Sequence, residues 1–184
     1  MSDASFSRLR VFFALWPGAP ERAALADWQP PLRELCGGKA MRADTLHATL
    51  VFLGDVSVHS LEALRLAAKE VEGTAFDLRL DNARYWGHNH IAYAAPSAVP
   101  PALSALVGEL EQRLRAHRFR FDSHAWKPHV TLLRHAQWSD DPLPVMPEVV
   151  WRAHDFVLVQ SLRDEQGPRY EVLARFPLAP RRVI

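Results

Sequence analysis

The stretch Leu46-His47-Ala48-Thr49-Leu50-Val51-Phe52-Leu53 decides how this chain is interpreted, because part of it occurs again as His129-Val130-Thr131-Leu132. Both copies follow the pattern His-x-Thr-hydrophobic and lie in runs of strand-forming residues, over 46–53 and 129–133. In a strand, residues i and i+2 point to the same face. Each copy therefore presents one imidazole and one hydroxyl group on one face, with apolar residues on the other.

Two such strands facing each other across a groove would bring together His47, His129, Thr49 and Thr131. Histidine titrates near neutral pH, so one imidazole can serve as a general base and the other as a general acid. The two hydroxyl groups can donate hydrogen bonds to the nonbridging oxygens of a phosphate. The repeated motif therefore indicates acid–base chemistry on a phosphate ester without a metal ion or other cofactor.

The sequence around the motifs mixes strand and helix patterns. Residues 9–16 form an apolar strand that ends at Pro17-Gly18, and the segment after Pro100 carries the clearest helical stripe in the chain. Further strands are expected over 76–80, 85–86, 91–94, 156–159 and 170–176. This order predicts an α+β fold, built as a duplicated unit with the active groove between two sheets.

Composition limits the class of protein. The chain has 184 residues, which fits one domain or two small lobes that share a core. The formal net charge of +1 argues against a protein that coats nucleic acid generally, but it permits a local basic groove. The one cysteine, Cys36, excludes an internal disulfide and fits a cytoplasmic protein. No apolar run approaches the length of a membrane span, so no membrane partner is expected.

Residues beyond the two tetrapeptides complete a resemblance to a known family. The sequence resembles the 2H phosphoesterase superfamily, and most closely the bacterial RNA 2′,3′-cyclic phosphodiesterases, also called the 2′-5′ RNA ligase family. The matching segments extend from near the start to near the end of the chain and comprise residues 10–17, 46–54, 128–134 and 170–178.

The resemblance implies a single domain over residues 1–184 made of two lobes, each carrying one His-x-Thr strand. It implies two antiparallel-type sheets with flanking helices, related by pseudo-two-fold symmetry, and a monomer that acts on RNA or oligonucleotide ends. The activity that it implies is metal-independent opening of a terminal 2′,3′-cyclic phosphate to a 2′-phosphate, with His47 as the proton donor and His129 as the proton acceptor. Attack by a 5′-hydroxyl in place of water would give 2′-5′ ligation, but we expect hydrolysis to dominate.

Three further residues are candidates for the substrate site. Arg134 would contact the phosphate, and Phe52 and Tyr170 could stack on a base. Arg134 and Phe52 each follow a motif histidine by five residues, which in an unbroken strand places them on the opposite face. Either residue reaches the groove only if its strand ends or forms a bulge first.

Two other functions remain open from the sequence. A binding module could capture nucleotide or RNA ends in the same groove without turnover, using only the threonines and basic residues. A metal-dependent hydrolase could use His88 and His90, a His-x-His pair that resembles half of a metal site. No third ligand is evident near that pair in the sequence, and a solvated turn is the simpler interpretation.

Overall fold

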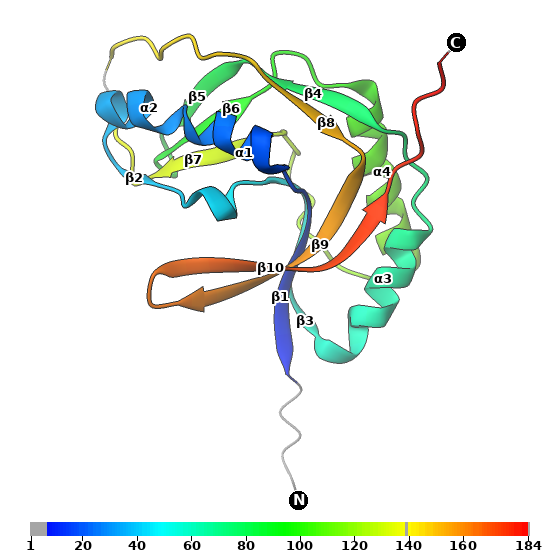
Figure 1. The fold of residues 1–184 in the computed structure, drawn as a ribbon. Helices are drawn as coiled ribbons and strands as arrows, with labels where there is room; N and C mark the ends of the chain where they lie inside the picture. Colours follow the sequence, from blue (N-terminus) through cyan, green and yellow to red (C-terminus); the bar gives the residue numbers. More distant parts are fainter. Residues whose placement is uncertain (1–6, 139, 184) are drawn as a thin grey trace, which may run out of the picture.

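The structure, a computed structural model, describes residues 7–138 and 140–183 (Figure 1). Its strands are β1 (Arg8–Leu15), β2 (Lys39–Ala40), β3 (Ala48–Ser57), β4 (Phe76–Leu80), β5 (Asn82–Trp86), β6 (Ile91–Ala95), β7 (Val130–Arg134), β8 (Val149–Ala153), β9 (Asp155–Asp164) and β10 (Gly167–Pro177). Its helices are α1 (Ala19–Ala26), α2 (Gln29–Cys36), α3 (Leu61–Lys69) and α4 (Pro101–Ala116), with short 3-10 turns η1 (Ala43–Thr45) and η2 (Val58–Ser60).

The strands form two four-stranded sheets and one two-stranded sheet. Their orders are β10-β9-β1-β3, β2-β7-β6-β5 and β4-β8, and all the paired strands are antiparallel. The predicted α+β class with antiparallel sheets is therefore confirmed. The two sheets that carry the motif strands are not the two halves of the chain, however, because β9 returns from the C-terminal part to pair with β1 and β10 then pairs with β9.

Strand β1 lies inside the first sheet and has two apolar faces. Val11, Phe13 and Leu15 point into the main core, where each is at most 1% exposed. Phe12 and Ala14 belong to a smaller apolar cluster on the other face. The continuous apolar run of this strand thus has a structural reason, because one face packs in the core and the other forms the floor of the site described below.

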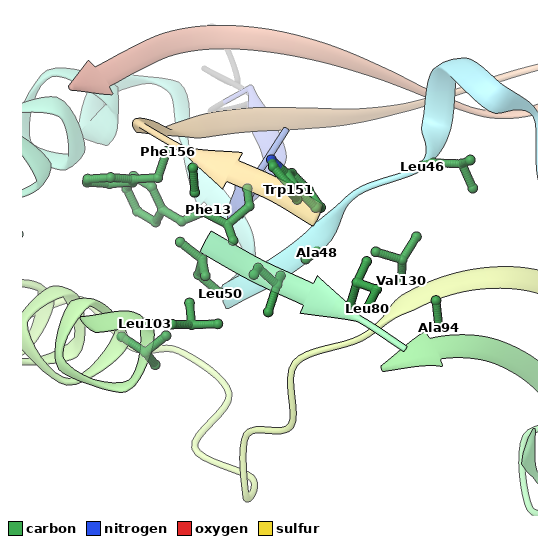
Figure 2. Close-up of a cluster of buried hydrophobic side chains, with 14 of the residues drawn as sticks. Phe13, Leu46, Ala48, Leu50, Leu80, Ala94, Leu103, Val130, Trp151 and Phe156 are labelled. Atoms are coloured by element: carbon green, nitrogen blue, oxygen red, sulfur yellow. The ribbon is translucent and has the colours of Figure 1, made fainter. Parts of the chain in front are cut away.

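The main core lies between the sheets and the long helices. Figure 2 shows Ala48 and Leu50 of β3 and Val130 of β7 in one buried cluster. These three residues are apolar alternates of the two motifs, and Phe13 of β1 belongs to the same cluster. Helix α4 buries the predicted stripe, comprising Leu103, Leu106, Val107, Leu110 and Leu114. Helices α3 and α4 lie side by side at one edge of the molecule (Figure 1).

Some predicted boundaries were wrong. The first motif strand starts later than expected, at Ala48, and continues through Gly54-Asp55 to Ser57. It continues because Gly54 adopts a positive φ of 76° beside a bulge, which lets the ladder with β1 resume at Val11. Strand β8 was not predicted, although buried residues (Val149, Trp151 and Ala153) alternate along it with exposed ones. No helix in the described part of the chain is long and apolar enough to cross a membrane.

Candidate active site

The two His-x-Thr motifs line one cavity of about 930 Å³. His47 directly precedes β3 and His129 directly precedes β7, while Thr49 and Thr131 lie within these strands. All four side chains border the cavity, although the two strands belong to different sheets. The structure therefore brings together the four residues that the repeated motif singled out.

A bulge follows the threonine of the first motif. Thr49 is opposite Ala14 and Val51 is opposite Phe13, so Leu50 has no partner on β1. Leu50 and Val51 are both buried in the core at 3% exposure, and the next residue, Phe52, borders the cavity. The extra residue shifts the alternation of the strand by one position.

The second motif contains the same bulge at the same position. Thr131 is opposite Tyr93 and Leu133 is opposite Ala92, so Leu132 has no partner on β6. Leu132 and Leu133 are both fully buried, and Arg134 borders the cavity. The two bulges explain how Phe52 and Arg134 reach the groove from positions five residues past a histidine.

Backbone and side-chain donors from elsewhere in the chain satisfy carbonyl groups at the bulges. The Leu132 carbonyl accepts hydrogen bonds from the Met41 backbone N–H at 2.9 Å and from the buried Gln29 amide at 3.0 Å. At the first bulge, the Trp126 indole N–H donates to the Thr49 carbonyl at 3.1 Å. Because an unpaired buried carbonyl is costly, these contacts stabilise the irregular strands that shape the site.

Backbone carbonyls fix the orientation of both imidazoles. Nδ1 of His47 donates to the Thr45 carbonyl at 2.7 Å, and Nδ1 of His129 donates to the Lys127 carbonyl at 2.8 Å. A carbonyl can only accept, so Nδ1 carries the hydrogen and Nε2 of the neutral ring is left with a lone pair. Nε2 of His47 lies 3.1 Å from Oγ1 of Thr49, which donates to it in this tautomer.

Aromatic rings surround each imidazole. The His47 ring lies 4.9 Å from Phe12, 5.0 Å from Tyr170 in an edge-on arrangement, and 5.8 Å from Trp16 in a stacked one. The His129 ring meets two aromatic rings edge-on, with centroid distances of 4.7 Å to Trp86 and 5.5 Å to Tyr93. These contacts limit ring rotation, and they leave both residues half-buried at the cavity wall.

The same surroundings disfavour the charged form of each histidine. Burial lowers the pKa of His47 to about 4, opposed by its hydrogen bond to Thr45 and reinforced by the nearby His129, Arg134 and Arg22. Burial also lowers the pKa of His129, opposed by the hydrogen bond to the Lys127 carbonyl. In the absence of an anion, both rings are therefore neutral at pH 7.

The cavity is cationic although the chain as a whole is nearly neutral. Its lining includes four arginines and one lysine, and no aspartate or glutamate of the described residues borders it. These cations are Arg10, Lys39, Arg42, Arg134 and Arg163. The local basic groove that the sequence permitted is thus present, and it suits a phosphate-bearing ligand.

The two aromatic candidates for base stacking both border the cavity, but each already has a neighbour. The guanidinium carbon of Arg10 lies 4.8 Å from the centroid of the Phe52 ring. Tyr170 packs edge-on against His47, and burial raises the pKa of its hydroxyl group. Tyr170 therefore contacts the imidazole directly.

The remaining histidines are arranged differently. His90 contacts the Tyr85 hydroxyl at 3.2 Å through Nδ1, and the His88 ring lies 6.4 Å from Trp86. Within residues 7–138 and 140–183, no three histidine, cysteine, aspartate or glutamate side chains gather as a metal site would require. His135 borders the cavity with a positive φ of 53°, an uncommon conformation for a residue with a side chain.

The sequence did not single out the residues that frame the histidines. Phe12 and Trp16 come from β1 and its end, and Trp86 and Tyr93 come from the β5–β6 hairpin. The alternation of Arg10, Phe12 and Ala14 along β1 was a usable signal, because it places a cation and an aromatic ring on one face. The cation at Lys39 could not be found in this way, since β2 has only two residues.

Two imidazoles with oriented Nε2 atoms in one cationic cavity define a site suited to acid–base chemistry on phosphate esters. Comparison with known proteins agrees with this. The model of the 2′-5′ RNA ligase superfamily matches residues 17–165. The chain belongs to this superfamily, and the resemblance noted in the sequence is confirmed.

Named relatives cover nearly the whole chain. It is 31% identical over 170 residues to an RNA 2′,3′-cyclic phosphodiesterase of Escherichia coli, which covers 92% of this chain and 96% of that protein. It is 30% identical over 183 residues to a protein of the same name from Thermus thermophilus. That match covers 92% of this chain and 90% of the T. thermophilus protein. The crystal structure of E. coli LigT complexed with 3′-AMP is similar with a TM-score of 0.83 and 29% identity, covering 94% of this chain and 99% of that one.

Proposed function

We propose that the protein hydrolyses the terminal 2′,3′-cyclic phosphate of RNA or oligonucleotides to a 2′-phosphomonoester, as an RNA 2′,3′-cyclic 3′-phosphodiesterase. The observation that carries this proposal is the pair of imidazoles that border one cationic cavity, each oriented through Nδ1 by a backbone carbonyl. The names of the relatives from E. coli and T. thermophilus support the same reaction.

The proposed reaction uses Nε2 of both rings. Nε2 of His129 takes a proton from a water molecule as the water oxygen bonds to phosphorus. The bond from phosphorus to the 3′ oxygen breaks, and that oxygen receives a proton from Nε2 of His47. The products are a 2′-phosphate and a 3′-hydroxyl group, and the two histidines have exchanged roles as acid and base.

His47 must acquire a proton before it can donate one. Its lowered pKa makes it neutral in the free protein, but the negative charge of a bound cyclic phosphate favours the imidazolium. Once Nε2 carries a hydrogen, it no longer accepts from the Thr49 hydroxyl, which becomes free to donate to a nonbridging oxygen. Thr131 and Arg134 are proposed to hold the same phosphate, and Phe52 and Tyr170 are the candidates for contact with the base.

The architecture supports one functional unit. Strand β1 near the start of the chain pairs with β9 near its end, so the first sheet needs both. We propose a single domain over residues 1–184 with two lobes, acting as a monomer in the cytoplasm. Reversal with a 5′-hydroxyl in place of water would give a 2′-5′ linkage in the same site.

Product analysis tests the proposed function. An oligoribonucleotide that ends in a 2′,3′-cyclic phosphate is incubated with the protein in the presence of a chelator, and products are followed by phosphorus NMR. We expect a 2′-phosphomonoester. The His135→Ala variant should form the same product, because His135 borders the cavity but has no role in the proposed reaction. Binding without turnover would favour the binding module, and loss of activity with chelator would favour a metal-dependent hydrolase.

A further inference from the structure

Arg22 on helix α1 ties together the two chain segments that deliver the His47 environment. Its guanidinium donates hydrogen bonds to the Leu46 carbonyl at 3.1 Å, to the Pro17 carbonyl at 3.3 Å and to the Ala43 carbonyl. Leu46 directly precedes His47, and Pro17 directly follows Trp16. One planar side chain therefore connects the backbone just before His47 to the backbone just after Trp16.

The same guanidinium reaches the imidazole indirectly through a ring. Its Cζ lies 5.4 Å from the centroid of Trp16, and the Trp16 ring stacks on His47 at 5.8 Å with an interplanar angle of 21°. Trp16 thus contacts a cation and the imidazole. Arg22 does not border the cavity, so it cannot touch a substrate bound there.

His129 is held in a different way. Its two aromatic neighbours, Trp86 and Tyr93, meet it edge-on, at 74° in both cases. Among the described residues, no arginine or lysine lies over either of those rings. The stack with a cation behind it is therefore specific to the histidine that we propose as the proton donor.

We propose that Arg22 is a positioning residue for His47, which fixes the segment before the imidazole and the Trp16 ring beside it so that Nε2 stays directed at the reacting phosphate. The proposal rests on the proposed function of His47. The hydrogen bonds to Ala43 and Leu46 fix the backbone before His47, and the contacts to Pro17 and the Trp16 ring fix the ring that stacks on the imidazole.

Arg22 also contributes to the charge around His47. The groups that face this ring are His129 and Arg134 from the side of β7, Tyr170 from β10, and Arg22 from α1, whose own charge is partly balanced by Asp44. Replacement of Arg22 by a neutral residue removes one of the cations that oppose protonation. The pKa of His47 then rises, while that of His129 is affected less.

The experiment compares Arg22→Met and Arg22→Lys with the parent protein by NMR titration of the histidine ring protons. Arg22→Met is expected to raise the pKa of His47, because a cation that lowers this pKa is removed, and the change at His129 should be smaller. Arg22→Lys keeps the charge and should leave the pKa of His47 nearly unchanged. Arg33→Met is the control, because Arg33 also donates to a backbone carbonyl, that of Gly38, but lies away from His47.

Kinetics then separates positioning from a purely structural role. Arg22→Lys loses the planar group with its several donors, so kcat should fall about 10- to 100-fold with little change in KM. Unchanged kcat in folded Arg22→Lys would overturn the proposal, as would an Arg22→Met protein in which His47 and His129 titrate as in the parent. If Arg22→Met fails to fold, Arg22→Lys decides alone. The titration needs no turnover, so failure of the proposed function would be seen separately, as a parent protein without activity.

Discussion

Phe52 and Arg134 occupy equivalent positions on the two motif strands, β3 and β7, and both border the cavity. Each follows a motif histidine by five residues, and each reaches the cavity because a bulge after the motif threonine shifts the alternation of its strand. The repeat in this chain thus extends beyond the tetrapeptide to the backbone irregularity that follows it. The same local geometry presents an aromatic ring to the cavity from β3 and a cation from β7.

Replacement of Arg134 should weaken the handling of the phosphate. Arg134→Gln is expected to lower kcat/KM about 10²-fold or more, because a charge-assisted donor to an oxygen that gains charge in the transition state is lost. Steady-state kinetics on a cyclic-phosphate oligonucleotide measures this. Arg169→Gln is the control, since Arg169 precedes Tyr170 on β10 but does not border the cavity. Equal effects of the two substitutions would contradict a phosphate contact for Arg134.

Replacement of Phe52 should affect the nucleoside and spare the phosphate. Phe52→Leu removes a ring that could stack on a base, so KM should rise by about 10-fold, given about 1–3 kcal/mol per stacked base, while kcat changes little. The comparison of a cyclic-phosphate dinucleotide with a substrate whose terminal base is absent isolates the contact. An equal loss on both substrates would show that Phe52 only supports Arg10, whose guanidinium lies over its ring.

Removal of the amide that satisfies the second bulge should cost stability and activity together. Gln29 donates to the carbonyls of Leu132 and Met41 at 3.0 and 2.8 Å. Gln29→Met leaves the buried Leu132 carbonyl and the partly buried Met41 carbonyl with one partner fewer each, which predicts a loss of about 1–3 kcal/mol in the free energy of unfolding. Urea denaturation measures this loss. Gln137→Met is the control, because Gln137 is exposed and its replacement should change the free energy of unfolding little. A destabilised protein with unchanged kcat would show that Arg134 does not depend on this bulge.

The lowered pKa of the half-buried His47 predicts how stability depends on pH. Its pKa is about 4 in the folded protein against an ordinary value of 6.5, so between these values the unfolded chain binds the extra proton. Stability from this group is therefore lost as the pH falls from 7 toward 4, by about 3 kcal/mol. His47→Gln removes the titration, so the variant should gain about that much relative to the parent over this range. A difference between the two proteins that stays constant from pH 7 to pH 4 would contradict a buried, neutral imidazole.

The sequence predicted those parts of the molecule that depend on local pattern. The motif strands, the α4 stripe and the β5–β6 hairpin follow from alternation and helical spacing, and all three are present. The bulges did not follow from the pattern, because they arise where β1 and β6 must register with their neighbours. The pairing of β9 with β1 is also a long-range contact that no local signal predicts.

The residues of the site also fall into those that local pattern predicted and those that depend on long-range packing. His47, His129, Thr49 and Thr131 were found because their spacing repeats, and the structure places them in one cavity. The aromatic rings beside the histidines and the Arg22 contacts depend on which elements pack together, so they required the structure.

A change of leaving group tests directly whether His47 is the proton donor and His129 the proton acceptor. A substrate with sulfur in place of the bridging 3′ oxygen has a leaving group that needs no proton. Acid or base catalysis contributes about 10²–10⁴-fold, so His47→Ala and His129→Ala should each lose that much on the oxygen substrate. On the sulfur substrate, His47→Ala should recover most of its activity while His129→Ala should not. Recovery of His129→Ala instead would reverse the two roles, and the absence of a loss in either variant on the oxygen substrate would contradict two-histidine catalysis.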